Sequence, residues 1–166
     1  MGSYSSAILR IRAIAKTHFK NSRASHDWEH TLRVCRLCRT IGSQEEADMD
    51  VLLAAAYLHD IGRSDQDVSR GKTCHAQTGA EIASAILNSI NLSRSRKRNI
   101  IHCIRAHRFR GGHLPKTTEA KILYDADKLD SIGAVGVARA FLFAGEVGAR
   151  LHNPHIRIED APPYSA

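Results

Sequence analysis

The chain has 166 residues, of which 43% are hydrophobic and 25% are charged, and its formal net charge is +7. This length suits one domain, and the hydrophobic content excludes a disordered or collagen-like chain. No apolar run approaches the ~18–20 residues that span a bilayer, and the polar start does not resemble a secretory signal. We therefore expect a cytoplasmic protein without a membrane segment.

Hydrophobic residues recur at helical spacing along most of the chain. The predicted helices cover residues 7–19, 25–42, 51–58, 74–87, 93–107, 118–129 and 132–144. The segment 51–58 is almost continuously apolar, which is typical of a central, buried helix. Polar residues 63–73 predict a loop, and the tail after residue 153 predicts irregular structure. The fold class is therefore all-α, a bundle of about six to seven helices around a buried central helix, in a single domain over residues 1–166.

Net charge, histidine content and cysteine spacing each indicate which ligands the protein binds. The positive charge suits an anionic partner, either nucleic acid or a phosphorylated small molecule. Ten histidines are about two to three times a typical share, and histidine is the commonest metal ligand. Cys35 and Cys38 form one CxxC pair inside a helical pattern, so the four cysteines are interpreted as buried or half-buried thiols and not as a zinc site.

Ionisable residues gather in four groups, at 27–30, at 59–60, at 125–130, and at three histidines spread over residues 75–107. Burying an unpaired carboxylate costs several kcal/mol, whereas a metal-bound carboxylate need not carry this cost. Imidazoles with carboxylates suit Mn²⁺, Mg²⁺, Fe²⁺, Co²⁺, Ni²⁺ or Zn²⁺. Taken singly, each histidine can instead be a packing residue, the pair at 59–60 a charge interaction at a helix end, and the aspartates at 125–130 a solvated face.

The order of three blocks favours the metal site. These blocks are His26-Asp27-Trp28-Glu29-His30 followed by Arg33-Val34, then Leu58-His59-Asp60-Ile61-Gly62, and finally residues 119–133, which contain Asp127. In this order they resemble the HD-domain superfamily of metal-dependent phosphohydrolases, in particular its small hydrolases and nucleotide pyrophosphohydrolases. The resemblance covers roughly residues 20–150 and implies an HD-domain helical bundle.

The resemblance also implies a ligand set. His30, His59, Asp60 and Asp127 would bind one divalent cation, leaving positions for water and a phosphate oxygen. A water on such a cation loses a proton near neutral pH and attacks phosphorus. We expect Asp27 or Glu29 to accept a hydrogen bond from the second ring nitrogen of a ligand histidine.

Some members of the superfamily hold a second metal with additional histidines. His75 resembles the first of these, and His107 resembles one of a later pair, whose preceding partner is Ala106 in this chain. We therefore expect one divalent metal. His75, His102 and His107 would then face the substrate or a weaker second metal site.

Phosphate binding requires fixed positive charge close to the metal. The expected phosphate-binding residues are Lys72, Lys128, Arg23, Arg63 and Arg108, although each can also be a solvated surface cation. The basic run at 94–98 is expected to be solvated. Related nucleotidases use an acidic residue shortly after the His-Asp doublet as catalytic acid or base, and Asp65 and Asp67 are the nearby alternatives here.

These observations predict a phosphohydrolase whose partner is a phosphorylated small molecule, with a nucleotide as the expected substrate. A di-iron oxygenase of the same fold is one alternative. Another is a non-catalytic basic module that binds nucleic acid or a signalling nucleotide, but retention of four metal ligands does not favour it. The resembled proteins continue past a segment similar to residues 159–164 into further helices. An apolar helix left exposed by their loss would favour a homodimer.

Overall fold

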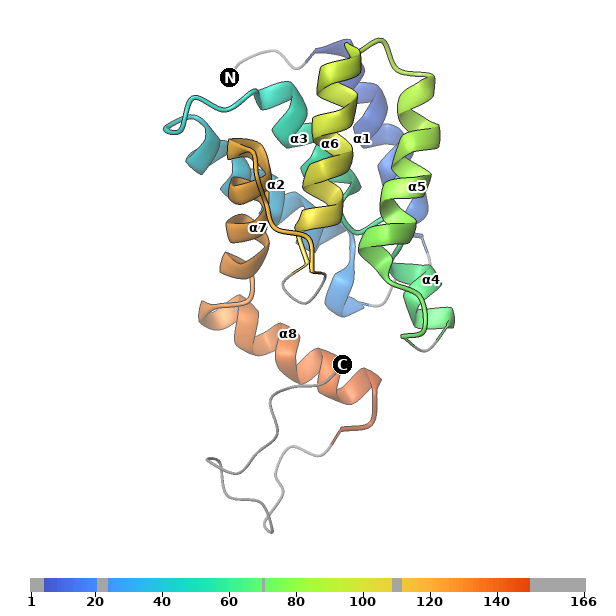
Figure 1. The fold of residues 1–166 in the computed structure, drawn as a ribbon. Helices are drawn as coiled ribbons and strands as arrows, with labels where there is room; N and C mark the ends of the chain where they lie inside the picture. Colours follow the sequence, from blue (N-terminus) through green and yellow to red (C-terminus); the bar gives the residue numbers. More distant parts are fainter. Residues whose placement is uncertain (1–4, 21–23, 70, 109–111, 150–166) are drawn as a thin grey trace.

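The computed structural model describes residues 5–20, 24–69, 71–108 and 112–149. Within these ranges the chain is helical throughout and contains no strand, so the expected all-α class is confirmed (Figure 1). None of the described helices combines the length and the hydropathy needed to cross a membrane. The elements are α1 (Ser6–His18), η1 (Ala24–His26), α2 (Trp28–Gly42), α3 (Met49–Leu58), α4 (Arg63–Val68), α5 (His75–Asn88), α6 (Arg94–Ala106), α7 (Thr118–Leu129) and α8 (Gly133–Glu146).

The centre of the bundle is α3. Each of its residues from Val51 to Leu58 is buried, and the helix packs against α1, α2, α6 and α7. A helix that is hydrophobic on all sides can be stable only when neighbours cover it completely. The buried thiols of Cys35, Cys38 and Cys103 lie in the same core, while Cys74 is half-buried. Among the described residues, no cysteine belongs to a group that could hold a metal ion.

Short polar side chains fix where several helices begin. Asp27, Asp48, Ser93 and Thr117 each accept a hydrogen bond from a backbone N–H in the first turn of the following helix. The expectation that a helix starts near Ser25 is therefore wrong, because the 3₁₀-helix η1 precedes α2. The consequence is that α2 presents its third residue, His30, close to its N-terminal end.

The segment after α3 is also more ordered than expected. Residues 63–68 form the short helix α4 within the stretch that the sequence predicted as a loop. The turn between α3 and α4 approaches α5 closely at Gly62. A Cβ atom there would lie 2.6 Å from both the carbonyl oxygen of His75 and the backbone nitrogen of Gly79. Only glycine permits this contact, which draws the end of α3 against the start of α5.

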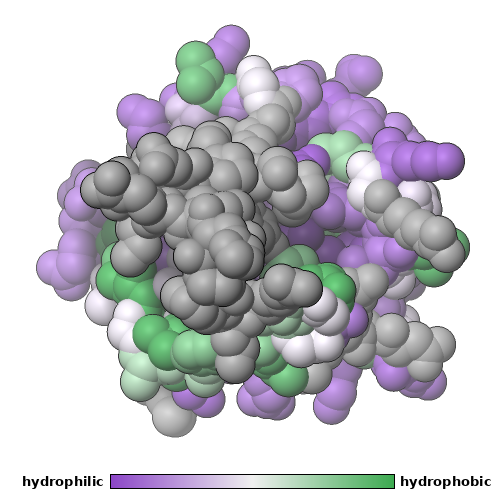
Figure 2. Space-filling model, turned by 90° about the horizontal axis from the view of Figure 1, so that it is seen from below, coloured by the Kyte–Doolittle hydropathy of each residue, from purple (hydrophilic) through white to green (hydrophobic). Residues whose placement is uncertain are grey.

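Helix α8 lies across one end of the bundle (Figure 1). Gly136 is its one buried residue in the part of the chain that the structure describes. Val137 and Phe141 are each 58% exposed, and the view from below shows hydrophobic side chains gathered on part of the surface (Figure 2). Polar contacts hold the helix instead, since Arg139 Nε donates to the Ser25 carbonyl at 3.0 Å and Glu146 accepts from the Ser25 hydroxyl at 2.6 Å.

Candidate metal centre

Five helices bring histidine and aspartate side chains to one place inside the bundle. The six side chains stand at helix ends, where the backbone changes direction and neighbouring helices converge. His30 begins α2, His59 and Asp60 follow α3, His75 begins α5, His107 follows α6, and Asp127 lies in the last turn of α7. All but Asp127 are buried by residue exposure, and the Asp127 side chain is 20% exposed.

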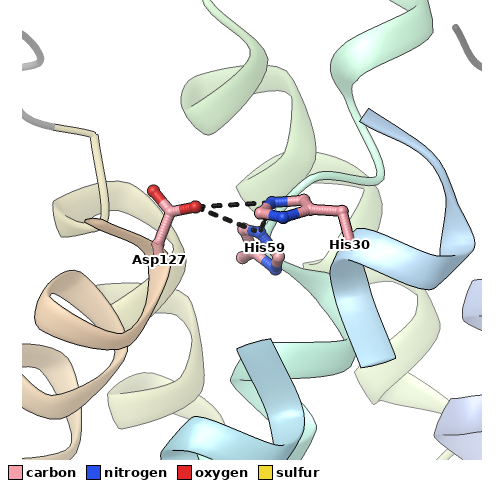
Figure 3. A group of neighbouring side chains, drawn as sticks. All are labelled: His30, His59 and Asp127. Atoms are coloured by element: carbon pink, nitrogen blue, oxygen red, sulfur yellow. Dashed lines mark hydrogen bonds and ion pairs between the residues drawn. The ribbon is translucent and has the colours of Figure 1, made fainter. Parts of the chain in front are cut away.

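The first group of donors consists of His30, His59 and Asp127 (Figure 3). The Nε2 atoms of His30 and His59 lie 3.4 Å apart. Asp127 Oδ1 lies 3.4 Å from His30 Nε2 and 3.9 Å from His59 Nε2. Two imidazole nitrogens and a carboxylate oxygen that point at one another at these distances fit a divalent cation placed between them.

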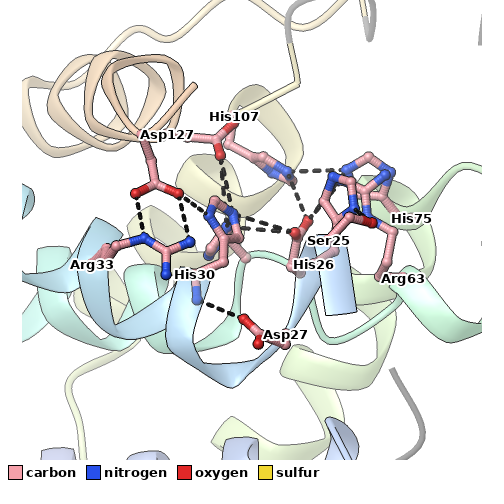
Figure 4. A network of polar contacts seen from close by, with 12 residues as sticks. Ser25, His26, Asp27, His30, Arg33, Arg63, His75, His107 and Asp127 are labelled. Carbon is pink, nitrogen blue, oxygen red and sulfur yellow. Dashed lines mark hydrogen bonds and ion pairs between the residues drawn. The ribbon is translucent and has the colours of Figure 1, made fainter. Parts of the chain in front are cut away.

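The second group consists of Asp60, His75 and His107. The Nε2 atoms of His75 and His107 lie 3.1 Å apart (Figure 4). They are 3.5 and 3.6 Å from Asp60 Oδ1. The other oxygen of the same carboxylate, Oδ2, lies 3.7 Å from the Nε2 atom of both His30 and His59. Asp60 therefore joins the two groups, with one oxygen facing each.

The far ring nitrogen of each of these histidines has its own acceptor. His59 Nδ1 lies 2.8 Å from the carbonyl oxygen of residue 56, and His107 Nδ1 lies 2.6 Å from that of residue 104. His75 Nδ1 lies 2.7 Å from the side-chain oxygen of Gln66 on α4. Such partners fix the ring orientation and leave Nε2 free to bind a metal.

For His30 the acceptor is Asp130, whose Oδ2 lies 2.7 Å from Nδ1. The expectation that Asp27 or Glu29 fills this place is therefore wrong. The Asp27 carboxylate accepts from the backbone N–H of His30 at 2.9 Å and so caps α2, while Glu29 is exposed. Residues adjacent on a helix point about 100° apart, which keeps the Glu29 side chain away from the ring.

Burial and neighbouring charges put four of the donors in the forms that bind metals, whereas the pKa of His30 is raised because its hydrogen bonds with Asp127 and Asp130 outweigh burial. Burial lowers the pKa of His59 to about 4 and that of His75 to about 2. Burial alone would raise the pKa of Asp60 and Asp127. For Asp60 the charge of Arg63 outweighs this effect, and for Asp127 the hydrogen bond with His30 does, so both pKa values lie well below the usual range. Neutral imidazoles and ionised carboxylates are the states that metal ligands require.

Two buried polar atoms at the centre lack a hydrogen-bond partner in the described part of the chain. They are Asp60 Oδ2, between the first two histidines, and Arg63 Nε, whose guanidinium lies 3.3 Å from Asp60 Oδ1. A buried carboxylate oxygen without a partner is costly to maintain. Because Asp60 Oδ2 lies among imidazole nitrogens and has no other partner within the described ranges, a cation bound there would compensate this oxygen. The nitrogen and carboxylate donors around it are also of the types that bind divalent cations.

The expected phosphate-binding residues lie at different distances from the candidate metal ligands. Lys128 Nζ donates to Asp127 Oδ2 at 2.8 Å and to the His107 carbonyl at 2.7 Å. Arg108 lies beside Cys74, with Nη1 3.3 Å from Sγ, and Lys72 is exposed shortly before α5. Arg23 lies outside the described residues.

Three expected residues are not in either group. Asp65 and Asp67 flank Gln66 on α4, and because Gln66 faces His75, its neighbours are rotated about 100° to either side. His102 belongs to neither group, since its Nε2 accepts from the backbone N–H of Lys116 at 2.9 Å.

Sequence reasoning missed the residues that support His30. Asp130 also accepts from Arg33 Nε at 2.7 Å and from Arg139 Nη1 at 2.8 Å, so three side chains converge on one carboxylate. The i, i+3 spacing of Asp127 and Asp130 was the available signal, because it places both on one face of α7. His26 was also overlooked; its ring packs edge-on against His30, and burial lowers its pKa to about 3.

Comparison with known proteins gives consistent matches. The family model described as HD domain matches residues 27–132. The uncharacterized protein YpgQ of Bacillus subtilis is 34% identical over 147 residues, which cover 86% of this chain and 69% of that protein. Ribonuclease Y of Chloroflexus aurantiacus is 28% identical over 72% of this chain, but the match spans only 21% of that protein.

Solved structures agree with the sequence matches. A predicted HD superfamily hydrolase from an uncultured Thermotogales bacterium superposes with a TM-score of 0.70 and 37% identity, covering 80% of this chain and 73% of that one. Bacillus subtilis YpgQ in complex with ADP superposes with a TM-score of 0.69 and 32% identity, covering 89% and 70%. The sequence matches and the structural matches therefore agree, since both include HD-domain proteins and YpgQ.

Proposed function

The chain belongs to the HD-domain family, and from this premise we propose that it is a metal-dependent phosphohydrolase that cleaves a phosphoester or phosphoanhydride of a nucleotide. The position of Asp60 carries the proposal. Its two oxygens lie 3.5–3.7 Å from the Nε2 atoms of four histidines, two on each side. A single ionised carboxylate shared by two imidazole pairs is an arrangement suited to divalent cations.

The first group, together with Asp60 Oδ2, would hold the tighter cation, because it provides four donors. The second group would hold a weaker one, because it provides three donors and Arg63 already contacts Asp60 Oδ1 at 3.3 Å. This proposal replaces the single metal expected from the sequence, and the donor types suit Mn²⁺, Mg²⁺, Fe²⁺, Co²⁺, Ni²⁺ or Zn²⁺. When bound, such cations polarise a phosphoryl group and lower the pKa of a water.

Two basic side chains, those of Arg63 and Lys128, would bind the phosphate group of the substrate. Arg63 has a buried Nε without a partner in the described residues, and this N–H would donate to a phosphoryl oxygen. Lys128 is half-buried beside Asp127, and its ammonium would turn from that carboxylate to the substrate. Both cations would act where negative charge develops during phosphoryl transfer. Arg108 and Lys72, near the start of α5, would bind the more distant phosphates.

A nucleotide is proposed as substrate because the similar protein YpgQ was solved in complex with ADP. The net charge of +7 also suits a phosphorylated ligand. The base, the sugar and the number of phosphates are set by contacts beyond the metal centre.

The test is release of phosphate or pyrophosphate from a panel of nucleotides. Metal-stripped protein is assayed with Mn²⁺, Co²⁺, Ni²⁺ or Mg²⁺ restored, alongside Asp60→Asn and, as a matched control, Asp125→Asn, which changes an exposed carboxylate of α7. We expect metal-dependent release that Asp60→Asn reduces at least a hundredfold and Asp125→Asn leaves unchanged. Absence of release from every nucleotide with every metal would contradict the proposal.

A further inference from the structure

A groove with a strongly positive lining runs between α5 and α6, outside the metal centre. It encloses about 610 Å³. Its lining contains four basic side chains and two histidines but no acidic residue among those described: Ser84, Leu87, Asn88, Arg94, Lys97, Arg98, Ile101, His102, Arg105 and His113. All four basic residues come from α6, so a single helix provides the charge of the groove.

The four cations are not neutralised within the described part of the chain. None of Arg94, Lys97, Arg98 and Arg105 forms an ion pair with a described residue. Arg96 belongs to the same basic run but not to the groove lining, and it behaves differently. Its guanidinium pairs with Asp48 at 2.7 Å and with Asp50 at 3.1 Å. The basic run therefore has a paired member and unpaired members, and the unpaired ones line the groove.

These positions are electrostatically unfavourable for the helix itself. The first turn of α6 contains no acidic residue, although the positive end of the helix dipole favours one. Arg94 and Arg98 also stand four residues apart on one face, where like charges repel. A negatively charged ligand lying along the groove would offset the unfavourable interaction of these cations with the helix dipole. It would also reduce the repulsion between Arg94 and Arg98.

The length of the charged row indicates an extended ligand. Arg105 follows Arg94 by eleven positions, which corresponds to about 16 Å along the helix axis. A single phosphate group cannot contact both ends of such a row, whereas a chain of phosphates can. His102 and His113 line the same groove, and imidazole rings provide faces on which unpaired bases stack.

We propose that the α5–α6 groove binds the backbone of a single-stranded nucleic acid. A positively charged groove that follows one backbone, with ring faces beside it, is the arrangement by which proteins bind single strands with little sequence preference. The groove thus gives a role to the basic run that the sequence alone predicted to be solvated. This groove is separate from the metal centre at which the proposed nucleotide substrate would bind, and binding in the groove requires no metal.

The test is fluorescence anisotropy of a labelled single-stranded RNA of mixed sequence titrated with the full, metal-stripped chain. We expect a Kd of about 10⁻⁴ to 10⁻⁶ M at physiological salt, with a slope of log K against log salt near −3 for four phosphate contacts. Arg94→Glu combined with Arg98→Glu should weaken binding at least tenfold and reduce the slope by about 1.4. The thermal midpoint should not fall, because glutamate suits the first turns of a helix.

The matched control is Arg10→Glu combined with Arg12→Glu, which changes the net charge equally at exposed positions of α1. We expect this control to weaken binding less than threefold. Equal weakening by both double variants would contradict the proposal, because net charge alone would then explain binding. Tighter association with vesicles of anionic phospholipid than with RNA, or no binding to RNA, would also contradict it.

Discussion

Asp130 holds His30 in place from a distance of 100 residues along the chain, through a contact of 2.7 Å between Oδ2 and Nδ1. Burial alone would raise the pKa of Asp130, but the hydrogen bond with His30 and the donation from Arg33 and Arg139 lower it to about 2 and keep the carboxylate ionised. Helix α8 thereby contributes to the metal centre although none of its own residues is a candidate ligand.

Asp130→Asn should therefore weaken metal binding without removing any ligand. The neutral amide loses the charge that increases the basicity of the imidazole and also loses its ion pairs with the two arginines. Loss of such an outer contact typically costs about 10- to 100-fold in metal affinity. Calorimetric titration of Mn²⁺ into metal-stripped protein measures the effect, and Asp125→Asn on the exposed side of α7 is the control. An Asp130→Asn variant that binds Mn²⁺ as tightly as the parent would refute this role.

The stability of the metal-free protein should fall as the pH is lowered from about 6.5 towards 4. Burial lowers the pKa of His26, His59 and His75 to about 3, 4 and 2, whereas in the unfolded chain these groups titrate near 6.5. Between these values the unfolded chain binds more protons, so protonation favours unfolding. His30 opposes this trend, because its pKa is raised by hydrogen bonds with Asp127 and Asp130 that outweigh burial.

Urea denaturation at pH 7 and pH 5 checks this expectation. We expect the free energy of unfolding to be lower at pH 5 by about 2–5 kcal/mol, because each of the three histidines contributes up to about 2 kcal/mol between pH 6.5 and 5 and His30 offsets part of the sum. Saturating Mn²⁺ at pH 7 should raise the denaturation midpoint, because the cation binds only the folded chain. A midpoint that is the same at pH 5 as at pH 7 would contradict the account.

Gly62→Ala should disturb the second group more than the first. The new methyl group would lie 2.6 Å from the His75 carbonyl oxygen and the Gly79 nitrogen, both backbone atoms that cannot rotate away. The turn that carries Asp60 must then move from α5, which separates the carboxylate from His75. We expect a loss of about 1–3 kcal/mol in stability, measured by urea denaturation. Gly145→Ala, where no atom lies within 4 Å of the added methyl, should cost nothing.

Glu146→Ala should loosen α8. Its carboxylate accepts from both the backbone N–H of Ser25, at 3.0 Å, and the Ser25 hydroxyl, at 2.6 Å, and the helix has little buried surface to replace these bonds. Amide hydrogen exchange should become faster along α8 and remain unchanged in α3. Unchanged exchange in α8 would show that Arg139 alone suffices to hold the helix.

The helices could be predicted because they depend on the local hydrophobic pattern, whereas the ligand set of His30, His59, Asp60 and Asp127 came from the resemblance to the HD-domain superfamily and stays a prediction. The apolar run 51–58 required burial, and His59 and Asp60 follow it directly, so their place near the centre was predictable. The partner of His30 was missed, because Asp130 is remote in the chain while Asp27 and Glu29 are adjacent, and the spacing of Asp130 from Asp127 was its one sequence signal. Helix α4 was missed because it buries no apolar face, and its contribution to the centre consists of polar contacts from Gln66 to His75 and from Arg63 to Asp60.

The most direct test of the account counts the metal ions, because its central claim is that Asp60 joins two cation sites. Titration calorimetry of metal-stripped protein with Mn²⁺ should show two binding events per chain. Asp127→Asn should weaken the tighter event, His107→Gln should abolish only the weaker one, and Asp60→Asn should impair both. A single event that His107→Gln leaves unchanged would contradict the shared role of Asp60.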